Sequence, residues 1–384
     1  MIPLRTKLPN IGMSIFPIMT ALAKEHGAVN LAQGFPGFSA DEELLKLINH
    51  YTSKGFNQYA PLMGYIPLRE KLSEKIEEQH QKYYHPEKEI CITAGATQAI
   101  YTAITALVEE GDEVIVIEPA YDCYVPAIIL NKGIPVRSQL KPISYEIDWD
   151  DIKRKINSLT KAILINTPHN PTGKVWKQSD IDELIKIVRN SNIFVISDEV
   201  YEHITFDGLP HLSVSKYPEL AERAFVIYSF GKTYHLTGWR TGYVVAPEYM
   251  MKEFVQSHQY MVYAVNTPIQ YALADYSLNK NAYTKLAGFF EQKRNAFIKS
   301  IQGSSFGILP CEGTYFLLLD YQNLSDTKDT DYANFLTKEY KIASIPTSVF
   351  YGNKRQDKVL RICFAKSDEE LEKGAEALCK VTAQ

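Results

Sequence analysis

Two ionisable residues stand at the ends of apolar segments that have the length of buried strands. Lys232 comes shortly after the segment 225–229, and Asp198 directly follows the segment 193–197. A lysine whose amine is kept neutral by burial forms Schiff bases with aldehyde cofactors. A buried carboxylate needs a partner, and the ring nitrogen of pyridoxal 5′-phosphate (PLP) is one that turns the ring into an electron sink. Each residue alone also fits a plainer interpretation, a strand-end lysine and a helix N-cap.

Two turns follow other apolar segments of the same kind. Gly95-Ala96-Thr97 comes after the segment 90–93 and opens a helical pattern, and the backbone N–H groups at a helix N-terminus bind phosphate. Asn170-Pro171-Thr172-Gly173 begins four residues after the segment 162–166. Asn170 can donate a hydrogen bond to a phenolate oxygen, although the four residues also fit a simple turn.

Strands and helices alternate through the middle of the chain, which predicts a mostly parallel sheet covered on both faces. The expected strands are 90–93, 113–117, 134–138, 162–166, 193–197, 225–229 and 242–246. The expected helices between them are 97–108, 124–130, 149–156 and 179–188. Ligands of such sheets bind beyond the carboxyl ends of the strands. The residues that follow the strands are therefore expected to meet at one site.

The pattern changes near residue 280 and predicts a smaller α+β domain. Its expected elements are the helix 282–301, the strand 314–319, the helix 332–339, the strand 359–364 and the helix 368–381. The N-terminal segment carries one expected helix, 14–26, and is expected to pack with this C-terminal part. We predict a large domain over 46–282, a small domain formed by 1–45 and 283–384, and a hinge at 282–288.

The composition excludes several classes of protein. The 384 residues include 45% hydrophobic and 22% charged residues, and the net charge is −4, so a basic surface for nucleic acid is not expected. No apolar run approaches the ~18 residues of a membrane span. The five cysteines form no CxxC pair, and the nine histidines show no metal-ligand spacing. We therefore expect a cytoplasmic protein without a membrane, nucleic-acid or metal partner.

The order and spacing of these motifs resemble those of the class I/II aminotransferases, PLP enzymes of fold type I, over essentially the whole chain. The motifs that carry the resemblance are NPTG at 170–173, SDEVY at 197–201 and SFGKTYHLTGWR at 229–240. QGFP at 33–36, GATQA at 95–99 and CEGTYFLL at 311–318 are most similar to the branch that contains methionine and kynurenine aminotransferases. The resemblance implies an α/β fold with a mostly parallel seven-stranded sheet, helices on both faces and a smaller α+β domain.

The resemblance also implies which residues hold PLP. Lys232 would bind its aldehyde and then shuttle the substrate proton, and Asp198 would pair with the ring nitrogen. Tyr201 and Asn170 would bind the ring oxygen, and Tyr121 would stack on the ring. The residues that would hold the phosphate are Gly95, Ala96, Thr97, Ser229 and Arg240. Many relatives have serine where this chain has Gly231, so one phosphate hydroxyl is missing.

The substrate contacts and the assembly are implied in the same way. Arg361 would grip the substrate α-carboxylate as a bidentate fork, helped by Asn170 and the backbone of Gly34. Phe16 and Phe35 would add apolar surface. Tyr59 would reach the cofactor phosphate of a second copy of the chain, which implies a homodimer with shared active sites.

The expected activity is transamination of an L-amino acid with an apolar or aromatic side chain to its 2-oxo acid, with an oxo acid as acceptor. No arginine occurs over 241–293, and the segment 260–266 is apolar and aromatic. A second carboxylate would be left unpaired there, so we expect methionine, then phenylalanine, tyrosine or kynurenine, to be better donors than aspartate. The alternatives are a cysteine-S-conjugate β-lyase, a kynurenine aminotransferase and, more remotely, a non-catalytic PLP-binding regulatory protein. The last is disfavoured because the set of Lys232, Asp198 and Arg361 is intact and the resemblance begins near residue 30.

Overall fold

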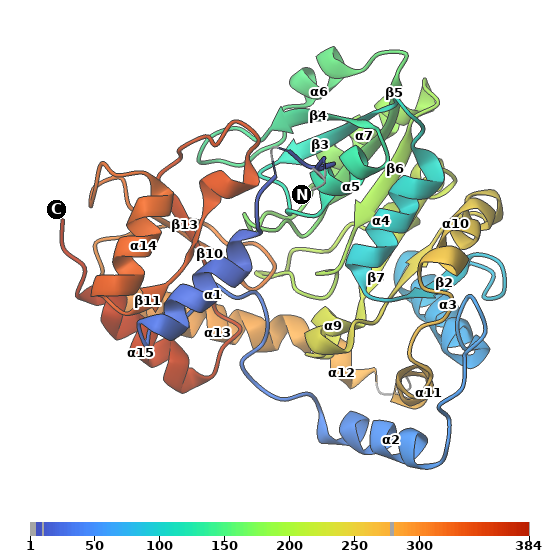
Figure 1. Cartoon of the computed structure of the whole chain (residues 1–384), viewed down its shortest axis with the longest axis horizontal. Coiled ribbons are helices and arrows are strands. Elements are labelled where there is room, and N and C mark those ends of the chain that lie inside the picture. Colours follow the sequence, from blue (N-terminus) through green and yellow to red (C-terminus); the bar gives the residue numbers. More distant parts are fainter. Residues whose placement is uncertain (1–4, 10, 277–279, 384) are drawn as a thin grey trace.

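A seven-stranded sheet forms the centre of the larger part of the molecule (Figure 1). The computed structural model describes residues 5–9, 11–276 and 280–383. The strand order is β2-β8-β7-β6-β5-β3-β4, and only the β2–β8 and β7–β8 pairs are antiparallel. The strands are β2 (Ile90–Thr93), β3 (Glu113–Glu118), β4 (Ile134–Gln139), β5 (Thr160–Asn166), β6 (Phe194–Asp198), β7 (Ala224–Ser229) and β8 (Gly242–Val245). The predicted sheet is confirmed.

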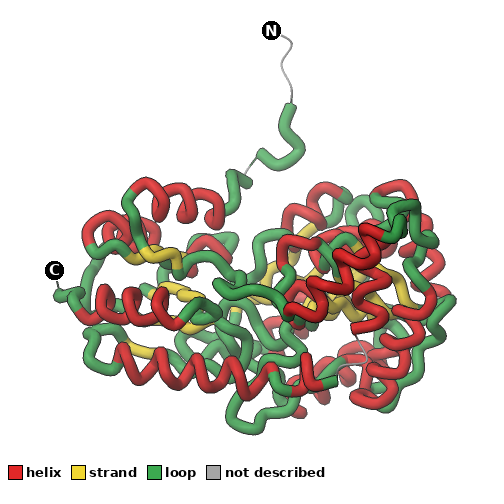
Figure 2. The backbone as a smooth tube through the Cα atoms, turned by 90° about the horizontal axis from the view of Figure 1, so that it is seen from below, coloured by secondary structure: helices red, strands yellow, loops and turns green. Residues whose placement is uncertain are grey.

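Successive residues of each strand pack against different helices, because side chains alternate between the faces of a sheet. In β3, Val114 and Val116 share one apolar cluster with α4, α5 and α10, whereas Ile115 and Ile117 share another with α3, α6 and α7. These helices are α3 (Ile66–His80), α4 (Ala96–Leu107), α5 (Tyr124–Leu130), α6 (Trp149–Lys155), α7 (Gln178–Arg189) and α10 (Glu248–Met261). The strands therefore lie within a shell of helices (Figure 2).

The C-terminal part is built on a smaller antiparallel sheet in the order β12-β13-β10-β9. Its strands are β9 (Gly307–Ile308), β10 (Phe316–Asp320), β12 (Ile345–Pro346) and β13 (Val359–Cys363), and its helices are α13 (Leu286–Ile301), α14 (Asp329–Glu339) and α15 (Asp368–Cys379). The N-terminal helix α1 (Ile15–Glu25) packs here, and β1 (Val29–Asn30) pairs in parallel with β11 (Ile342–Ala343) (Figure 1). The N-terminal segment thus joins the C-terminal part; the domain boundaries themselves stay predictions.

The remaining elements connect the two parts or border the site. They are α2 (Glu42–Ser53), α8 (Pro218–Ala221), α9 (Phe230–Thr233), α11 (Thr267–Tyr276), α12 (Asn281–Thr284) and the 3₁₀ turns η1 (Val214–Lys216), η2 (Thr237–Trp239) and η3 (Thr347–Phe350). The helix expected over 282–301 is two helices, since α12 ends at Thr284 and α13 begins at Leu286. Among the described residues, no helix is long and apolar enough to cross a membrane.

Candidate active site

A cavity of about 280 Å³ lies beyond the carboxyl ends of the central strands, where the large sheet meets the C-terminal part. Twelve of the fifteen predicted site residues line it: Phe16, Gly34, Ala96, Thr97, Tyr121, Asn170, Asp198, Tyr201, Ser229, Lys232, Arg240 and Arg361. The structure therefore brings together residues from segments that lie far apart in the sequence. Gly95, Phe35 and Tyr59 do not line the cavity.

Lys232 enters the cavity from α9, the single helical turn that follows β7. Its Nζ lies 3.3 Å from the carbonyl oxygen of Gly34 and 5.6 Å from the ring centroids of Tyr201 and Tyr315. Burial lowers the pKa of the Lys232 amine to about 8, and the guanidinium groups of Arg240 and Arg361 act in the same direction. An amine with this pKa has a usable neutral fraction at neutral pH, as a nucleophile or a base requires.

Asp198 is the last residue of β6, and its side chain is buried. The Tyr124 hydroxyl donates to Oδ2 at 2.5 Å, and the Val200 N–H donates to Oδ1 at 3.3 Å. Burial raises the pKa of Asp198 to about 6, against the opposing effect of these donors. The residues after Asp198 form turns and not a helix, so it does not act as the cap of a helix here. A carboxylate has about four acceptor sites, so this one retains capacity for a further N–H donor.

The N-terminus of α4 forms part of the cavity wall. Its N-cap, Gly95, offers no side chain to the free N–H groups of the first turn, which include those of Ala96 and Thr97. A Cβ on Gly95 would lie 2.6 Å from Nη2 of Arg240, so the glycine acts by letting that guanidinium approach. With the Ser229 hydroxyl, these groups form a cradle suited to a phosphate.

Gly231 packs closely against the turn η2. A Cβ at this position would lie 3.1 Å from Cα of Thr237 and 3.4 Å from Oγ of Ser229. The backbone of η2 thus leaves little room for a larger residue.

Arg361 reaches the cavity from β13 of the smaller sheet and is 1% exposed. Its Nη1 donates to Oδ1 of Asn170 at 2.8 Å, and its Nη2 donates to the carbonyl oxygen of Ala32 at 3.0 Å. The ring of Phe316 lies 4.0 Å from its Cζ, and that of Phe16 lies 5.1 Å away. Within the described part of the chain, no acidic side chain forms an ion pair with Arg361. A buried guanidinium with only neutral partners is suited to bind the carboxylate of a ligand.

Two predicted residues lie at the surface of the chain. Phe35 is 42% exposed, and its ring lies 4.3 Å from Nζ of Lys366. The two residues before it, Gln33 and Gly34, line the cavity. Tyr59 is 82% exposed and makes an edge contact with the ring of Tyr263 at 5.3 Å between centroids.

Several residues in the cavity lining were not predicted from the sequence: Gln33, Ile100, Tyr124, Asn166, Val200 and Phe316. One of them had a signal in the sequence, since Asn166 ends an expected strand. The Asn166 side chain donates to the backbone oxygen of Asp198 at 2.8 Å and accepts from the Asn170 N–H at 2.8 Å. It thereby ties the end of β6 to the predicted turn that begins at Asn170.

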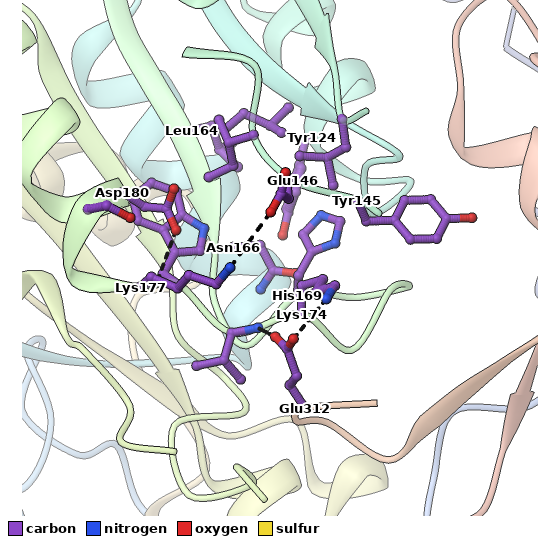
Figure 3. Close-up of a pocket in the computed structure, with 16 residues that line it drawn as sticks. Tyr124, Tyr145, Glu146, Leu164, Asn166, His169, Lys174, Lys177, Asp180 and Glu312 are labelled. Atoms are coloured by element: carbon purple, nitrogen blue, oxygen red, sulfur yellow. Dashed lines mark hydrogen bonds and ion pairs between the residues drawn. The ribbon is translucent and has the colours of Figure 1, made fainter. Parts of the chain in front are cut away.

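A second cavity of about 230 Å³, drawn in Figure 3, adjoins this site and shares Tyr124 and Asn166 with it. Its lysines are paired with carboxylates. Lys174 donates to Glu312 at 2.7 Å, and Lys177 lies 3.7 Å from Glu146. In contrast, no ion-pair partner occurs among the described residues for the cations of the first cavity, which are Lys232, Arg240 and Arg361. The first cavity is therefore the candidate active site.

The donor set of the first cavity fits PLP. A buried amine of lowered pKa, a buried carboxylate with free acceptor capacity, a tyrosine ring and a phosphate cradle occur within one small volume. Arg361 adds a separate site for a carboxylate. The set thus offers a partner for the aldehyde, the ring nitrogen, the ring face and the phosphate of the cofactor.

Comparisons with known proteins agree with this chemistry. The profile of the family described as aminotransferase class I and II matches residues 27–378. The chain is 45% identical to the methionine aminotransferase of Escherichia coli over 375 residues, which covers 97% of each chain. It is 33% identical to the human kynurenine–oxoglutarate transaminase 1, covering 94% of this chain and 93% of the relative.

Solved structures give the same result. A structure from Escherichia coli described as having methionine aminotransferase function matches with a TM-score of 0.96 and 45% identity, covering 99% of this chain and 100% of that one. The N-succinyldiaminopimelate aminotransferase of Mycobacterium tuberculosis matches with a TM-score of 0.94 and 32% identity, over 99% and 100% of the two chains. This chain therefore belongs to the class I and II aminotransferases, which are pyridoxal 5′-phosphate-dependent enzymes.

Proposed function

We propose that this aminotransferase uses methionine as its preferred amino donor, followed by phenylalanine, tyrosine or kynurenine. The observation that carries this proposal is the apolar environment of the Arg361 guanidinium. The rings of Phe316, Phe16 and Phe350 lie 4.0, 5.1 and 5.6 Å from its Cζ. A substrate whose α-carboxylate binds Arg361 therefore meets apolar surface nearby, which favours a thioether or an aromatic side chain at about 25 cal/mol per Å² buried.

The charges of the cavity support the same preference. Among its described lining residues, the cationic side chains are Lys232, Arg240 and Arg361. We assign Lys232 to the cofactor aldehyde, Arg240 to the phosphate and Arg361 to the α-carboxylate. Aspartate would bring a second carboxylate without a cation to receive it, at a high desolvation cost. The names of the Escherichia coli and human relatives, a methionine aminotransferase and a kynurenine transaminase, point in the same direction.

The positions of the residues support these proposed roles. When bound, PLP would supply an electrophilic aldehyde and an electron sink for the bond between Cα and its hydrogen. Lys232 would hold the cofactor and would act as the base for the Cα proton. Asp198 would pair with the ring nitrogen, Tyr201 and Asn170 would bind the ring oxygen, and Tyr121 would cover the ring.

A panel of amino donors tests the substrate preference. Purified enzyme with PLP is mixed with methionine, phenylalanine, tyrosine, kynurenine or aspartate, and the half-reaction is followed by the change in cofactor absorbance. We expect the highest kcat/KM for methionine and a value at least ~100-fold lower for aspartate. This ratio corresponds to a cost of about 2.7 kcal/mol for the unpaired second carboxylate. The highest value for aspartate would contradict the proposal. Formation of pyruvate and ammonia from a cysteine S-conjugate, faster than any transamination, would instead favour the β-lyase alternative.

We further propose that the active enzyme is a cytoplasmic homodimer in which Tyr59 serves the phosphate site of the other copy. Tyr59, Tyr260 and Tyr263 are 82%, 90% and 52% exposed, and the rings of Tyr59 and Tyr263 are in contact. Exposed aromatic clusters of this kind mark interaction surfaces. Sedimentation of the purified enzyme at the mass of two chains is expected, and a monomer with full activity would exclude a shared site. Cell fractionation tests the location.

A further inference from the structure

Tyr124 forms the wall between the active-site cavity and the second cavity behind it. It is the first residue of α5 and is only 2% exposed. Its ring makes an edge contact with the ring of Tyr121, at 5.8 Å between centroids and an interplanar angle of 71°. The packing of α5 against the sheet thus fixes where its hydroxyl lies.

The hydroxyl makes one strong contact. It donates to Oδ2 of Asp198 at 2.5 Å, the short distance typical of a hydroxyl bound to a carboxylate. The only other donor to this carboxylate within the described residues is the Val200 N–H, at the longer distance of 3.3 Å. Burial and the neighbouring Asp198 charge raise the pKa of Tyr124 well above 10, so the hydroxyl keeps its proton and remains a donor.

We propose that Tyr124 is a positioning residue, which orients the Asp198 carboxylate and stabilises its ionised form for the ring nitrogen of PLP. The proposal rests on the proposed function of this site. The backbone of Asp198 is fixed at the end of β6, but the rotation of its carboxyl group is set by the hydrogen-bond donors to its two oxygens. With Oδ2 held by Tyr124, the remaining acceptor capacity is fixed in direction.

The charge state of Asp198 depends on the same contact. Burial raises the pKa of Asp198 to about 6, and the Tyr124 hydroxyl is the first of the groups that oppose this rise. The other titratable groups that interact with Asp198 are Lys232, Glu199, Tyr121, Tyr201 and Cys123. Loss of the hydroxyl is therefore expected to raise the pKa of Asp198 further and to increase its protonated fraction near neutral pH.

Tyr124→Phe removes the hydroxyl and keeps the ring in place. Tyr84→Phe is the matched control, since Tyr84 is fully buried and its hydroxyl donates to Ser215 at 3.4 Å, away from both cavities. For both variants, the PLP dissociation constant of the holoenzyme, the thermal stability and the methionine half-reaction are measured. A single-turnover titration separates the rate constant from the apparent methionine dissociation constant.

For Tyr124→Phe we expect PLP binding to weaken about 10- to 100-fold, the range for a lost hydrogen bond to a charged group. The half-reaction rate constant should fall at least ~10-fold, while the methionine dissociation constant changes less than ~2-fold, because Arg361 and Asn170 are untouched. Tyr84→Phe should lose only stability. PLP binding and rate constants of Tyr124→Phe within twofold of the wild type, or equal losses in both variants, would overturn the proposal.

A double-mutant cycle tests whether Tyr124 acts through Asp198. If it does, Tyr124→Phe added to Asp198→Asn should weaken PLP binding less than ~2-fold further. A full, additive loss would overturn the proposal, since Tyr124 would then act independently of Asp198. These outcomes differ from a failure of the proposed function, in which the wild-type enzyme itself would not bind PLP or transaminate any donor in the panel.

Discussion

Replacement of Gly95 by alanine is expected to weaken PLP binding far more than it destabilises the fold. Gly95 is the N-cap of α4 with φ 80° and ψ 166°, a backbone conformation that is essentially restricted to glycine. A Cβ there would also lie 2.6 Å from Nη2 and 2.9 Å from Cζ of Arg240. The substitution therefore combines backbone strain with displacement of a guanidinium group.

The two effects have separate magnitudes. The backbone strain costs about 1–3 kcal/mol of folding free energy. Ordinary contact begins near 3.4 Å, so the guanidinium, the free end of a flexible side chain, moves by about 0.8 Å (3.4 − 2.6) at little cost in stability. Charge-assisted hydrogen bonds to phosphate have a narrow length range of about 2.7–2.9 Å, so this shift breaks them. Loss of that contact is expected to weaken PLP binding by about 1.5–3 kcal/mol, or about 10- to 100-fold.

The assay is equilibrium PLP binding, with thermal unfolding measured in parallel. Gly111→Ala is the control, because Gly111 also has a positive φ, 93°, but a Cβ there would meet no atom within 4 Å. We expect both variants to lose stability and only Gly95→Ala to lose PLP affinity. Unchanged PLP affinity in Gly95→Ala, or an equal loss in Gly111→Ala, would refute the assignment of Arg240 and the α4 N-terminus to the phosphate.

Three further predictions concern other parts of the site. Burial raises the pKa of Asp198 from 3.8 to about 6, so between these pH values the native apo-protein keeps a proton that the unfolded chain releases, and its stability falls as the pH rises. The unfolding free energy of apo Asp198→Asn should therefore increase relative to that of the wild type from about pH 4 to about pH 6, and a difference that stays constant with pH would contradict the shift. Arg361→Lys should raise the KM for methionine about 10- to 100-fold, because an ammonium cannot replace the fork that binds a carboxylate, and an unchanged KM in steady-state kinetics would remove Arg361 from the substrate site. Mixing inactive Lys232→Ala chains with Tyr59→Ala chains should restore activity above either parent, since one site of each heterodimer is then intact; no gain after verified exchange of chains would argue against a shared site.

The central sheet and much of the cavity could be predicted because parallel topology brings the ends of strands together. Asp198 and Lys232 are found from the sequence because each closely follows a buried strand, and the predicted family and cofactor are confirmed. Tyr124 was not predicted, because its role depends on the distance of its hydroxyl from Asp198, a contact between residues 74 positions apart. Such a contact leaves no local pattern in the sequence.

Other differences have local physical causes. Gly95 does not line the cavity, and it makes room for the Arg240 guanidinium, while its expected contact with the phosphate stays a prediction. Phe35 lies outside the cavity that its neighbour Gly34 lines, and its ring packs under the Lys366 ammonium instead. The helix expected over 282–301 is interrupted at Lys285, which is at once the C-cap of α12 and the N-cap of α13. Apolar periodicity alone does not reveal a one-residue break of this kind.

The site at which PLP becomes covalently attached decides whether this cavity is the active site. The purified enzyme is loaded with PLP, reduced with borohydride and digested, and the peptides are sequenced by mass spectrometry. We expect a pyridoxyl phosphate adduct on Lys232, whose amine has its pKa lowered to about 8 and lies in the cavity with Asp198 and Arg361. An adduct on a different lysine, or none in a protein that is fully loaded with the cofactor, would contradict it.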